Sequence, residues 1–293
     1  MTASVALGAV PALSDHEFLL LRDWIHAQAG IHLAPAKKSL LVARLGRRLR
    51  ALGLPSFDAY YRLVTSRAGS SERVNLLDCI TTNETHFFRG PRQFEYLDRT
   101  LFPAWRADAR ARRASASVRV WSAGCSTGEE PFSLAMLLLD HFPPASGFAL
   151  SILATDLSTR VLAQAGRATW PLDRSEEISL PHRKAYMLRG TGSQQGLMRA
   201  GPEIRSLVRF ERLNLNDPRY AVDGVFDLIL CRNVLIYFDA ASRAAVIDRL
   251  IDRLAPRGVL LLGHTEGLRD LTGRVRSLVP TIYAHVRGIE RAA

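Results

Sequence analysis

Cysteine is rare in this sequence of 293 residues, and it contains no long apolar run. The three cysteines are odd in number and far apart, which predicts neither a disulfide framework nor a metal site: Cys79, Cys125 and Cys231. A membrane helix needs about 18 consecutive apolar residues, and residues 1–13 lack the basic leader of a secretory signal. We therefore expect a soluble, cytoplasmic protein in which the segment 1–13 is flexible.

Lysine is equally rare, although the chain is strongly basic. Its 39 lysines and arginines outnumber 28 acidic residues, giving a formal charge of +11, and only three of them are lysines: Lys37, Lys38 and Lys184. Such an excess implies an acidic partner, which is a nucleic acid, an anionic membrane surface or an acidic protein group, and charge alone does not decide among them. The eight histidines show no HxH or HExxH spacing, so we expect no metal site.

The first part of the chain has a helical period. Ser14 and Glu17 form a capping box and Gly30 can end the helix, which predicts a helix over 14–29. Further helices are expected over 35–52, from Ser56 through Leu63, and from Ser70 or Ser71 to Ile80. We expect an all-helical N-terminal domain over 14–90, followed by a linker helix over 91–116.

The remainder alternates between apolar runs of strand length and helical stretches. Strands are expected over 118–122, 149–155, 225–231, 258–263 and 281–286, and helices over 130–140, 158–166 and 240–254. This alternation predicts an α/β domain over 117–293 with a doubly wound, mostly parallel sheet. Prolines and glycines break the rhythm between 170 and 212, which indicates a small inserted β-subdomain.

A turn of small residues follows the first predicted strand and leads into a helix. Gly124 and Gly128 let a ligand approach the backbone, and a helix N-terminus attracts negative groups. The turn has neither the P-loop ending nor the GxGxxG spacing, which argues against nucleoside triphosphates and dinucleotides. Glu129 and Glu130 would repel a pyrophosphate but suit an ammonium group or hydroxyl donors, although acids are also favoured in any first helical turn.

Other polar residues stand at the ends of apolar runs. Asp156 ends the second strand, where an acid either accepts hydrogen bonds from ribose hydroxyls or caps the next helix. Asn214 and Asn233 follow two further apolar runs and fit either an adenine edge or a turn. Ahead of the sheet, residues 81–90 mix polar and aromatic side chains without a helix or strand period, which is typical of a pocket between domains or of an ordinary loop.

Five runs stand in a fixed order along the chain: NETHFFR (83–89), WSAGCSTGEEP (121–131), ATD (154–156), CRNVLIYFD (231–239) and GHTE (263–266). Together they resemble the signatures of the CheR family of chemotaxis receptor methyltransferases, and the similarity extends from Ser14 to Val286. It implies a Rossmann-like, S-adenosylmethionine-dependent catalytic domain with an all-helical N-terminal domain and an inserted small antiparallel β-subdomain. It also implies transfer of a methyl group from S-adenosylmethionine to receptor glutamates, which leaves S-adenosylhomocysteine.

The resemblance implies a set of cofactor residues. Asn83, Thr85 and Arg89 would line the cofactor and the active site, Glu130 would lie near the methionine moiety and Asp156 on the ribose. The glycine turn contributes Gly124, and the adenosine and sulfonium end would be surrounded by Asn214, Leu215, Asn233 and Val234.

Two residues are expected to act on the substrate. A glutamate with a pKa of about 4.3 is already ionised at neutral pH, so no general base is needed. The enzyme must instead align one carboxylate oxygen with the S–methyl bond and exclude water. Arg89 is expected to hold this carboxylate with its planar guanidinium, and Tyr237 to orient it.

Two surfaces are expected to bind the receptor. The first is the basic stripe, which we define as four cations on one face of the helix 35–52: Lys37, Arg44, Arg47 and Arg48. A solvated helix face explains such a stripe equally well. The second is the glycine-rich stretch 188–199. The resemblance implies that a receptor C-terminal pentapeptide adds to a sheet edge there and meets Arg189 or Arg199, unless the subdomain only covers that edge.

Two other functions stay open on the sequence. A nucleic-acid methyltransferase would share the cofactor fold and suit the charge, but residues 233–237 lack the two prolines typical of enzymes that methylate base amino groups. A noncatalytic cofactor-binding adaptor would be expected to have lost Arg89, Asp156 or the glycine turn, and all three are present. We expect a monomer that binds methyl-accepting chemotaxis receptors and no nucleic acid.

Overall fold

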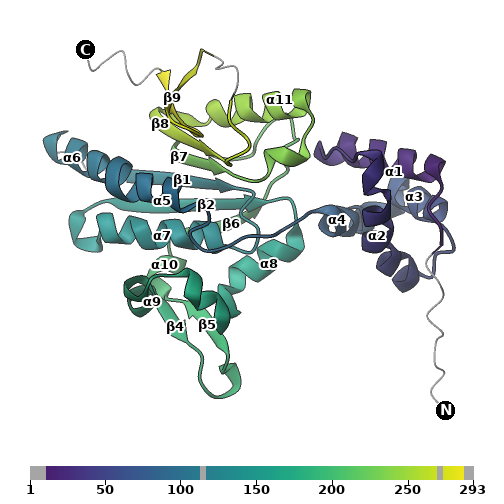
Figure 1. Ribbon diagram of the computed structural model, residues 1–293, viewed down its shortest axis with the longest axis horizontal. Helices are drawn as coiled ribbons and strands as arrows, with labels where there is room; N and C mark the ends of the chain where they lie inside the picture. The colour runs from purple at the N-terminus through teal and green to yellow at the C-terminus, as the bar shows by residue number, and fades with distance from the viewer. Residues whose placement is uncertain (1–10, 113–116, 269–272, 287–293) are drawn as a thin grey trace. The chain divides into compact units, whose positions relative to one another are not determined.

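The structure is a computed structural model that describes residues 11–112, 117–268 and 273–286. Contacts between Cα atoms divide the chain into two compact units. The helical unit contains residues 11–82 together with 237–243, and the sheet unit contains the described residues of 83–236 and 244–286 (Figure 1). This division falls after Thr82, eight residues before the expected boundary at 90. Of the segment expected to be flexible, residues 1–10 lie outside the described residues and Leu13 is buried.

The helical unit begins where its capping residues predict. Its helices are α1 (Asp15–Ala29), the short 3₁₀ turn η1 (Pro35–Lys37), α2 (Lys38–Leu52), α3 (Phe57–Thr65), the turn η2 (Arg67–Gly69) and α4 (Ser70–Ile80). Ser14 and Glu17 form the predicted capping box, and Gly30 closes α1 with a φ of 68°. Ser56 caps α3 as expected. Neither Ser70 nor Ser71 caps α4, because the helix continues from η2 and its N-cap is Gly69.

Apolar side chains and one buried acid fill this unit. Leu21, Ile25, Leu45 and Leu49 are fully buried, which follows from the helical stripes in the sequence. Glu72 of α4 is also buried, and its carboxylate accepts hydrogen bonds from Arg48 Nε and Tyr60 Oη at 2.9 Å each. The helices therefore enclose a satisfied ion pair as well as a hydrophobic core.

A mixed seven-stranded sheet forms the centre of the sheet unit, with the order β6-β2-β1-β7-β8-β10-β9. The strands are β1 (Ser117–Ala123), β2 (Ala149–Asp156), β6 (Val208–Arg212), β7 (Phe226–Cys231), β8 (Leu254–Leu262), β9 (Val275–Val279) and β10 (Ile282–His285). The first five in this order are parallel, whereas β10 is antiparallel to both β8 and β9. The strand order reverses beside β1, which is the position where open α/β sheets bind ligands.

Helices and short helical turns accompany this sheet, and the last two of them extend into residues 237–243 of the helical unit. They are α5 (Pro91–Tyr96), the π-helix η3 (Leu97–Leu101), α6 (Phe102–Arg112), α7 (Glu129–His141), η4 (Pro144–Ser146), α8 (Thr159–Arg167), α10 (Pro202–Arg205), η7 (Leu235–Tyr237) and α11 (Ala240–Ile251). The segment expected as a linker helix, 91–116, is helical over its described part. It places Phe94, Leu97 and Phe102 in the main hydrophobic core, so it packs as part of the sheet unit.

A second, antiparallel sheet interrupts the order of the main sheet. It consists of β3 (Thr169–Pro171), β4 (Met187–Arg189) and β5 (Leu197–Ala200) in the order β3-β5-β4. With η5 (Leu172–Glu177), α9 (Leu180–Tyr186) and η6 (Gly192–Gln194) it forms the inserted subdomain, residues 169–200 (Figure 1). The expected end at 212 is wrong, because residues 208–212 form β6 and pair in parallel with β2 of the main sheet.

Candidate active site

The glycine turn after β1 lies close to the loop that follows β7. Gly124 has a φ of 86°, and its N–H donates to the carbonyl of Thr155 at 2.8 Å. A Cβ at Gly124 would collide with the side chain of Val234, and the positive φ also disfavours any other residue. The geometry thus brings together Gly124 and Val234, two of the residues predicted to bind the cofactor.

Asp156 at the end of β2 has its carboxylate fixed by two backbone amides. Oδ2 accepts the N–H of Ser126 and Oδ1 accepts the N–H of Ser158, at 2.9 Å each. The N-cap of α8 is Ser158, whose hydroxyl accepts from Val161 N. Asp156 is therefore not the helix cap, and the amide of the glycine turn orients its buried carboxylate at the carboxyl end of the sheet.

Glu130 in the first turn of α7 belongs to a buried ion pair that the sequence did not reveal. Its Oε1 accepts from Ser122 Oγ at 2.8 Å, and its Oε2 pairs with Arg232 Nη1 at 3.1 Å. The side chain of Arg232 is 2% exposed and also donates to the main-chain carbonyl of Arg89. A Cβ at Gly90 would strike this guanidinium. The only signal in the sequence was a charged residue placed directly after the apolar run 225–231.

The segment 83–89 has no helix or strand over its residues. The carbonyl of Asn83 accepts from Ser126 Oγ at 2.8 Å, which attaches the start of the segment to the glycine turn. Arg89 donates from Nη1 to the carbonyl of Glu84 at 2.8 Å and is partly exposed. Arg89 therefore has a fixed main chain, and its guanidinium retains further N–H donors.

Glu266 holds the loop after β7, and the run GHTE (263–266) that contains it did not predict this role. Its side chain, buried to 1% exposure, accepts from Asn233 N at 2.7 Å, Gly263 N at 2.8 Å and Ile236 N at 3.0 Å. Asn233 has a φ of 59°, an uncommon conformation that Asn tolerates better than most residues. The predicted cofactor residues Asn233 and Val234 thus stand on a loop fixed by a buried carboxylate.

Asn214 and Leu215 follow β6, beside the end of β2. The N–H of Leu213 donates to the carbonyl of Asp156 at 3.0 Å, which brings this loop to the carboxyl end of the main sheet. Asn214 Oδ1 accepts from Asn216 N at 3.0 Å, an Asx turn. Leu215 is buried, and its carbonyl accepts from Tyr220 and Arg249. Both residues therefore stand on an ordered loop next to Asp156.

Two family models match the chain and together cover most of it. The description "CheR methyltransferase, SAM binding domain" matches residues 83–283, and "CheR methyltransferase, all-alpha domain" matches residues 16–81. The chain belongs to the CheR methyltransferase family. It is an S-adenosylmethionine-dependent methyltransferase, with the Rossmann-like domain and the helical N-terminal domain that the sequence predicted.

Three relatives of this CheR methyltransferase cover nearly its whole length. The chemotaxis protein methyltransferase of Escherichia coli (strain K12) is 39% identical over 93% of this chain and 92% of its own. That of Salmonella typhimurium is 37% identical over 93% and 91%. The chemotaxis protein methyltransferase 2 of Pseudomonas aeruginosa is 36% identical over 92% of each chain.

The hydrogen-bonding groups at the candidate site of this CheR methyltransferase fit its cofactor. S-adenosylmethionine presents an ammonium group and ribose hydroxyls, which donate hydrogen bonds that carboxylates accept. Glu130 and Asp156 are buried carboxylates at the carboxyl end of the main sheet, and the glycine turn between β1 and α7 admits a close approach to the backbone. Among the described residues, no group of three or more His, Cys, Asp and Glu side chains is arranged to hold a metal ion.

Tyr237 and the basic stripe belong to the helical unit of this CheR methyltransferase. The carbonyl of Tyr237 accepts from His32 N at 2.7 Å. Within the stripe, Arg44 donates to the carbonyl of Ile80 and to Thr82 Oγ1, and Arg48 pairs with the buried Glu72. Lys37 and Arg47 are exposed. The stripe is therefore not a uniform solvated face, because two of its four cations hold the fold together.

The thiols near the candidate site are not suited to be nucleophiles. Burial raises the pKa of Cys125 and of Cys231, and a protonated thiol is a poor nucleophile. Burial likewise raises the pKa of Glu129, which accepts from Thr127 Oγ1 at 2.6 Å.

Within the described part of the chain, no helix is long and apolar enough to span a membrane.

Proposed function

We propose that this CheR methyltransferase methylates the γ-carboxylate of specific glutamates on the cytoplasmic helical domains of methyl-accepting chemotaxis receptors. The products are glutamate methyl esters and S-adenosylhomocysteine. The names of the relatives support a role in chemotaxis, and the resemblance of the five sequence runs supports the glutamate substrate. We also propose a cytoplasmic location, which follows from the side of the membrane on which such a substrate lies, and a monomeric state.

One observation carries the proposal: one buried guanidinium contacts both a proposed cofactor residue and the main chain of the proposed substrate clamp. Arg232 pairs with Glu130, the proposed neighbour of the methionine ammonium, and donates to the main chain of Arg89, the proposed substrate clamp. A methyltransferase must hold donor and acceptor in one fixed relation, because positioning supplies most of the rate in a reaction that needs no general base. A shared anchor for both residues provides that relation.

The roles in the reaction are proposed residue by residue. S-adenosylmethionine supplies a methyl group on a positively charged sulfur. The residues proposed to surround it are Asn83, Thr85, Arg89, Gly124, Glu130, Asp156, Asn214, Leu215, Asn233 and Val234. Arg89 holds one oxygen of the substrate carboxylate, and Tyr237 orients the group through its hydroxyl. The second oxygen would stay free to accept the methyl group as the bond between sulfur and the methyl carbon breaks, which leaves S-adenosylhomocysteine.

We propose that the exposed part of the basic stripe docks the receptor. Arg44 binds Thr82 and Arg48 binds Glu72, so reversing the charge of either arginine would disturb the packing of α2 and α4 as well as any docking. Lys37 and Arg47 are exposed and suit the test. The pair Lys37→Glu and Arg47→Glu should raise the KM for a receptor fragment without changing cofactor affinity, and the wild-type rate should fall with salt. A rate indifferent to both would remove α2 from recognition.

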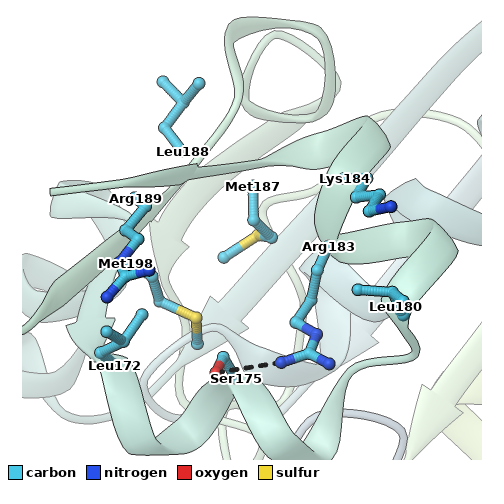
Figure 2. A pocket seen from close by; sticks show the side chains of 9 residues that line it. All are labelled: Leu172, Ser175, Leu180, Arg183, Lys184, Met187, Leu188, Arg189 and Met198. Carbon is cyan, nitrogen blue, oxygen red and sulfur yellow. Dashed lines mark hydrogen bonds between the residues drawn. The ribbon is translucent and has the colours of Figure 1, made fainter.

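The inserted subdomain offers a pocket for the C-terminal pentapeptide of the receptor, which would act as a tether for the enzyme. A pocket of about 400 Å³ is lined by Leu172, Ser175, Leu180, Arg183, Lys184, Met187, Leu188, Arg189 and Met198. Figure 2 shows Met187 and Met198 pointing into it and Leu188 pointing away. In the register of β4 and β5, Arg189 lies opposite Met198, whereas Arg199 lies opposite Leu188. Cross-strand partners share a face, so the two arginines lie on opposite faces.

This arrangement suits an added strand. Among the described strands, β4 pairs only with β5, and a peptide added along its other edge would alternate its side chains between the two faces. An aromatic side chain would enter the pocket beside Arg189, and its neighbour in the peptide would face Arg199. A titration with an aromatic and acidic receptor C-terminal pentapeptide should give a micromolar Kd. Undetectable binding at millimolar peptide would mean that the enzyme finds receptors without a tether.

The function is tested with labelled S-adenosylmethionine and a receptor cytoplasmic fragment. Base-labile methanol release identifies a methyl ester, and mass spectrometry locates the modified glutamates. Arg89→Ala should lower turnover by at least about a hundredfold while cofactor affinity, measured by calorimetry, stays largely intact. Label on DNA or RNA would support a nucleic-acid methyltransferase instead. Cofactor binding without transfer to any of these acceptors would support a noncatalytic adaptor.

A further inference from the structure

The short helix η5 of the inserted subdomain presents two charged side chains to the segment 83–89. Arg174 Nη2 donates to the carbonyl of Thr85 at 2.6 Å and lies 3.4 Å from Glu129 Oε1. Its Nε forms an ion pair with Glu177 Oε1 at 2.7 Å. Glu177 Oε2 in turn accepts the main-chain N–H of Phe87 at 2.8 Å. One ion pair on η5 thus fixes a carbonyl and an amide two residues apart.

Aromatic side chains of the same subdomain extend this contact. Trp170 of β3 meets the ring of Phe87 edge to face, with 5.0 Å between the centroids. His182 of α9 stacks on Phe88 at 5.3 Å with an interplanar angle of 5°. The inserted subdomain therefore contacts consecutive residues of the segment through its helices η5 and α9 and its strand β3.

The main chain of the segment depends on such contacts because its residues form no helix or strand. Besides η5, its anchors are Ser126, which donates to the carbonyl of Asn83, Ser133, which accepts from Phe88 N at 2.9 Å, and Arg232 on the carbonyl of Arg89. The main chain of the central residues 85 and 87 is held by hydrogen bonds to Arg174 and Glu177. A displacement of this stretch moves the residues on both sides of it.

We propose that Arg174 and Glu177 are positioning residues for methyl transfer, which makes the inserted subdomain part of the active-site framework. They fix the main chain at Thr85 and Phe87 and thereby set the direction in which the Arg89 side chain points. This inference rests on the proposed roles of Asn83, Thr85 and Arg89. Neither residue contacts the reacting atoms, so both act through the segment 83–89.

The test compares Glu177→Ala with Glu176→Ala in the full chain. Glu176 lies next to Glu177 on the same helix and is exposed, so it is a matched control. With receptor fragment and cofactor saturating, Glu177→Ala should lower kcat at least roughly tenfold, because displacements near 1 Å already cost this much in positioned reactions. The Kd for S-adenosylhomocysteine should rise only about threefold, since most proposed cofactor residues lie outside the segment. Arg174→Gln should behave in the same way.

Rescue separates positioning from folding. Glu177→Gln retains an oxygen that accepts from Phe87 N, so its kcat should return to within about threefold of wild type. A purely structural role would lower the melting temperature of Glu177→Ala and leave kcat per folded molecule at the value of Glu176→Ala, and that result would overturn the inference. Arg89→Ala distinguishes the two proposals. Full turnover of this variant refutes the clamp, whereas a slow Arg89→Ala beside a normal Glu177→Ala refutes only the inference drawn from η5.

Discussion

Each of the two units buries a glutamate paired with an arginine, and the two pairs have different consequences. In the helical unit, Arg48 and Glu72 join α2 to α4, and Tyr60 and Asn75 complete the hydrogen bonds of the carboxylate. In the sheet unit, Arg232 joins Glu130 to the main chain of Arg89, and its guanidinium lies over the ring of Phe94. The first pair contacts residues to which we assign no role in the reaction, and the second contacts the proposed cofactor and substrate residues. The chemistry of a buried ion pair therefore does not reveal its role, which depends on the third group that the arginine reaches.

The largest effect should come from Arg232→Gln. Turnover should fall by more than about a hundredfold, because the variant releases both Glu130 and the carbonyl of Arg89. It should also lower the free energy of unfolding by about 3–5 kcal/mol, since it leaves a buried carboxylate without its cation. Adding Glu130→Gln should restore part of the stability without restoring turnover. Turnover close to wild type in the folded variant would show that this ion pair, like that of the helical unit, contributes to stability and not to the reaction.

Asp156→Asn should have a smaller effect that is confined to the cofactor. The amide keeps one oxygen for a backbone N–H but loses the charge and an acceptor that suit ribose hydroxyls. Calorimetry should show S-adenosylhomocysteine bound about 1.5–3 kcal/mol more weakly. Unchanged affinity would leave Asp156 with a structural role, in which it accepts the N–H groups of Ser126 and Ser158.

Arg48→Gln should change stability and leave catalysis alone. The side chain of Arg48 is 29% exposed, so its loss should cost about 1–3 kcal/mol in chemical denaturation, less than the loss of Arg232. With saturating receptor fragment, kcat per folded molecule should equal that of the wild type. A lowered kcat would show that the ion pair of the helical unit also reaches the reaction.

The smallest effect is a pH dependence of the helical unit. Burial alone would raise the pKa of Glu72, but hydrogen bonds from Arg48, Asn75 and Tyr60 outweigh it and lower the pKa. A carboxylate with a lowered folded pKa stabilises fully above its unfolded pKa of about 4.3, and this contribution is lost as the pH falls through the folded value. The difference in unfolding free energy between wild type and Glu72→Gln should therefore shrink below this pH. A constant difference between pH 6 and the acid range would contradict the assignment.

Local signals predicted the helical unit well, and distant pairings explain what the sequence did not show. The capping box at Ser14 and the cap at Ser56 lie within four residues of the groups that they bind, so they can be found in a single chain. In contrast, Glu130 and Arg232 are 102 residues apart, and no pattern in the neighbouring sequence of either residue predicts that they pair. The strand β6 was assigned to the inserted subdomain because its partner β2 lies far back in the sequence.

The basic stripe shows the same limit on a single helix. A helical projection of residues 35–52 groups the four cations on one face, but it does not show that Glu72 and the end of α4 lie within reach of Arg48 and Arg44. In the candidate site, the glycine turn and Asp156 were proposed from their positions at strand ends. Arg174, Glu177 and Glu266 were missed because each acts on the main chain of a loop from another element.

The scarcity of lysine makes this protein unusually easy to map with amine-reactive reagents. Apart from the amino terminus, such a reagent finds three side chains. Lys37 stands on the exposed part of the basic stripe, Lys184 lines the pocket of the inserted subdomain, and Lys38 is paired with Asp15. None of the proposed cofactor residues is a lysine, so acylation leaves them unmodified. Protection of Lys37 and Lys184 by a receptor fragment, followed peptide by peptide in a mass spectrometer, would report on each proposed receptor-binding surface separately.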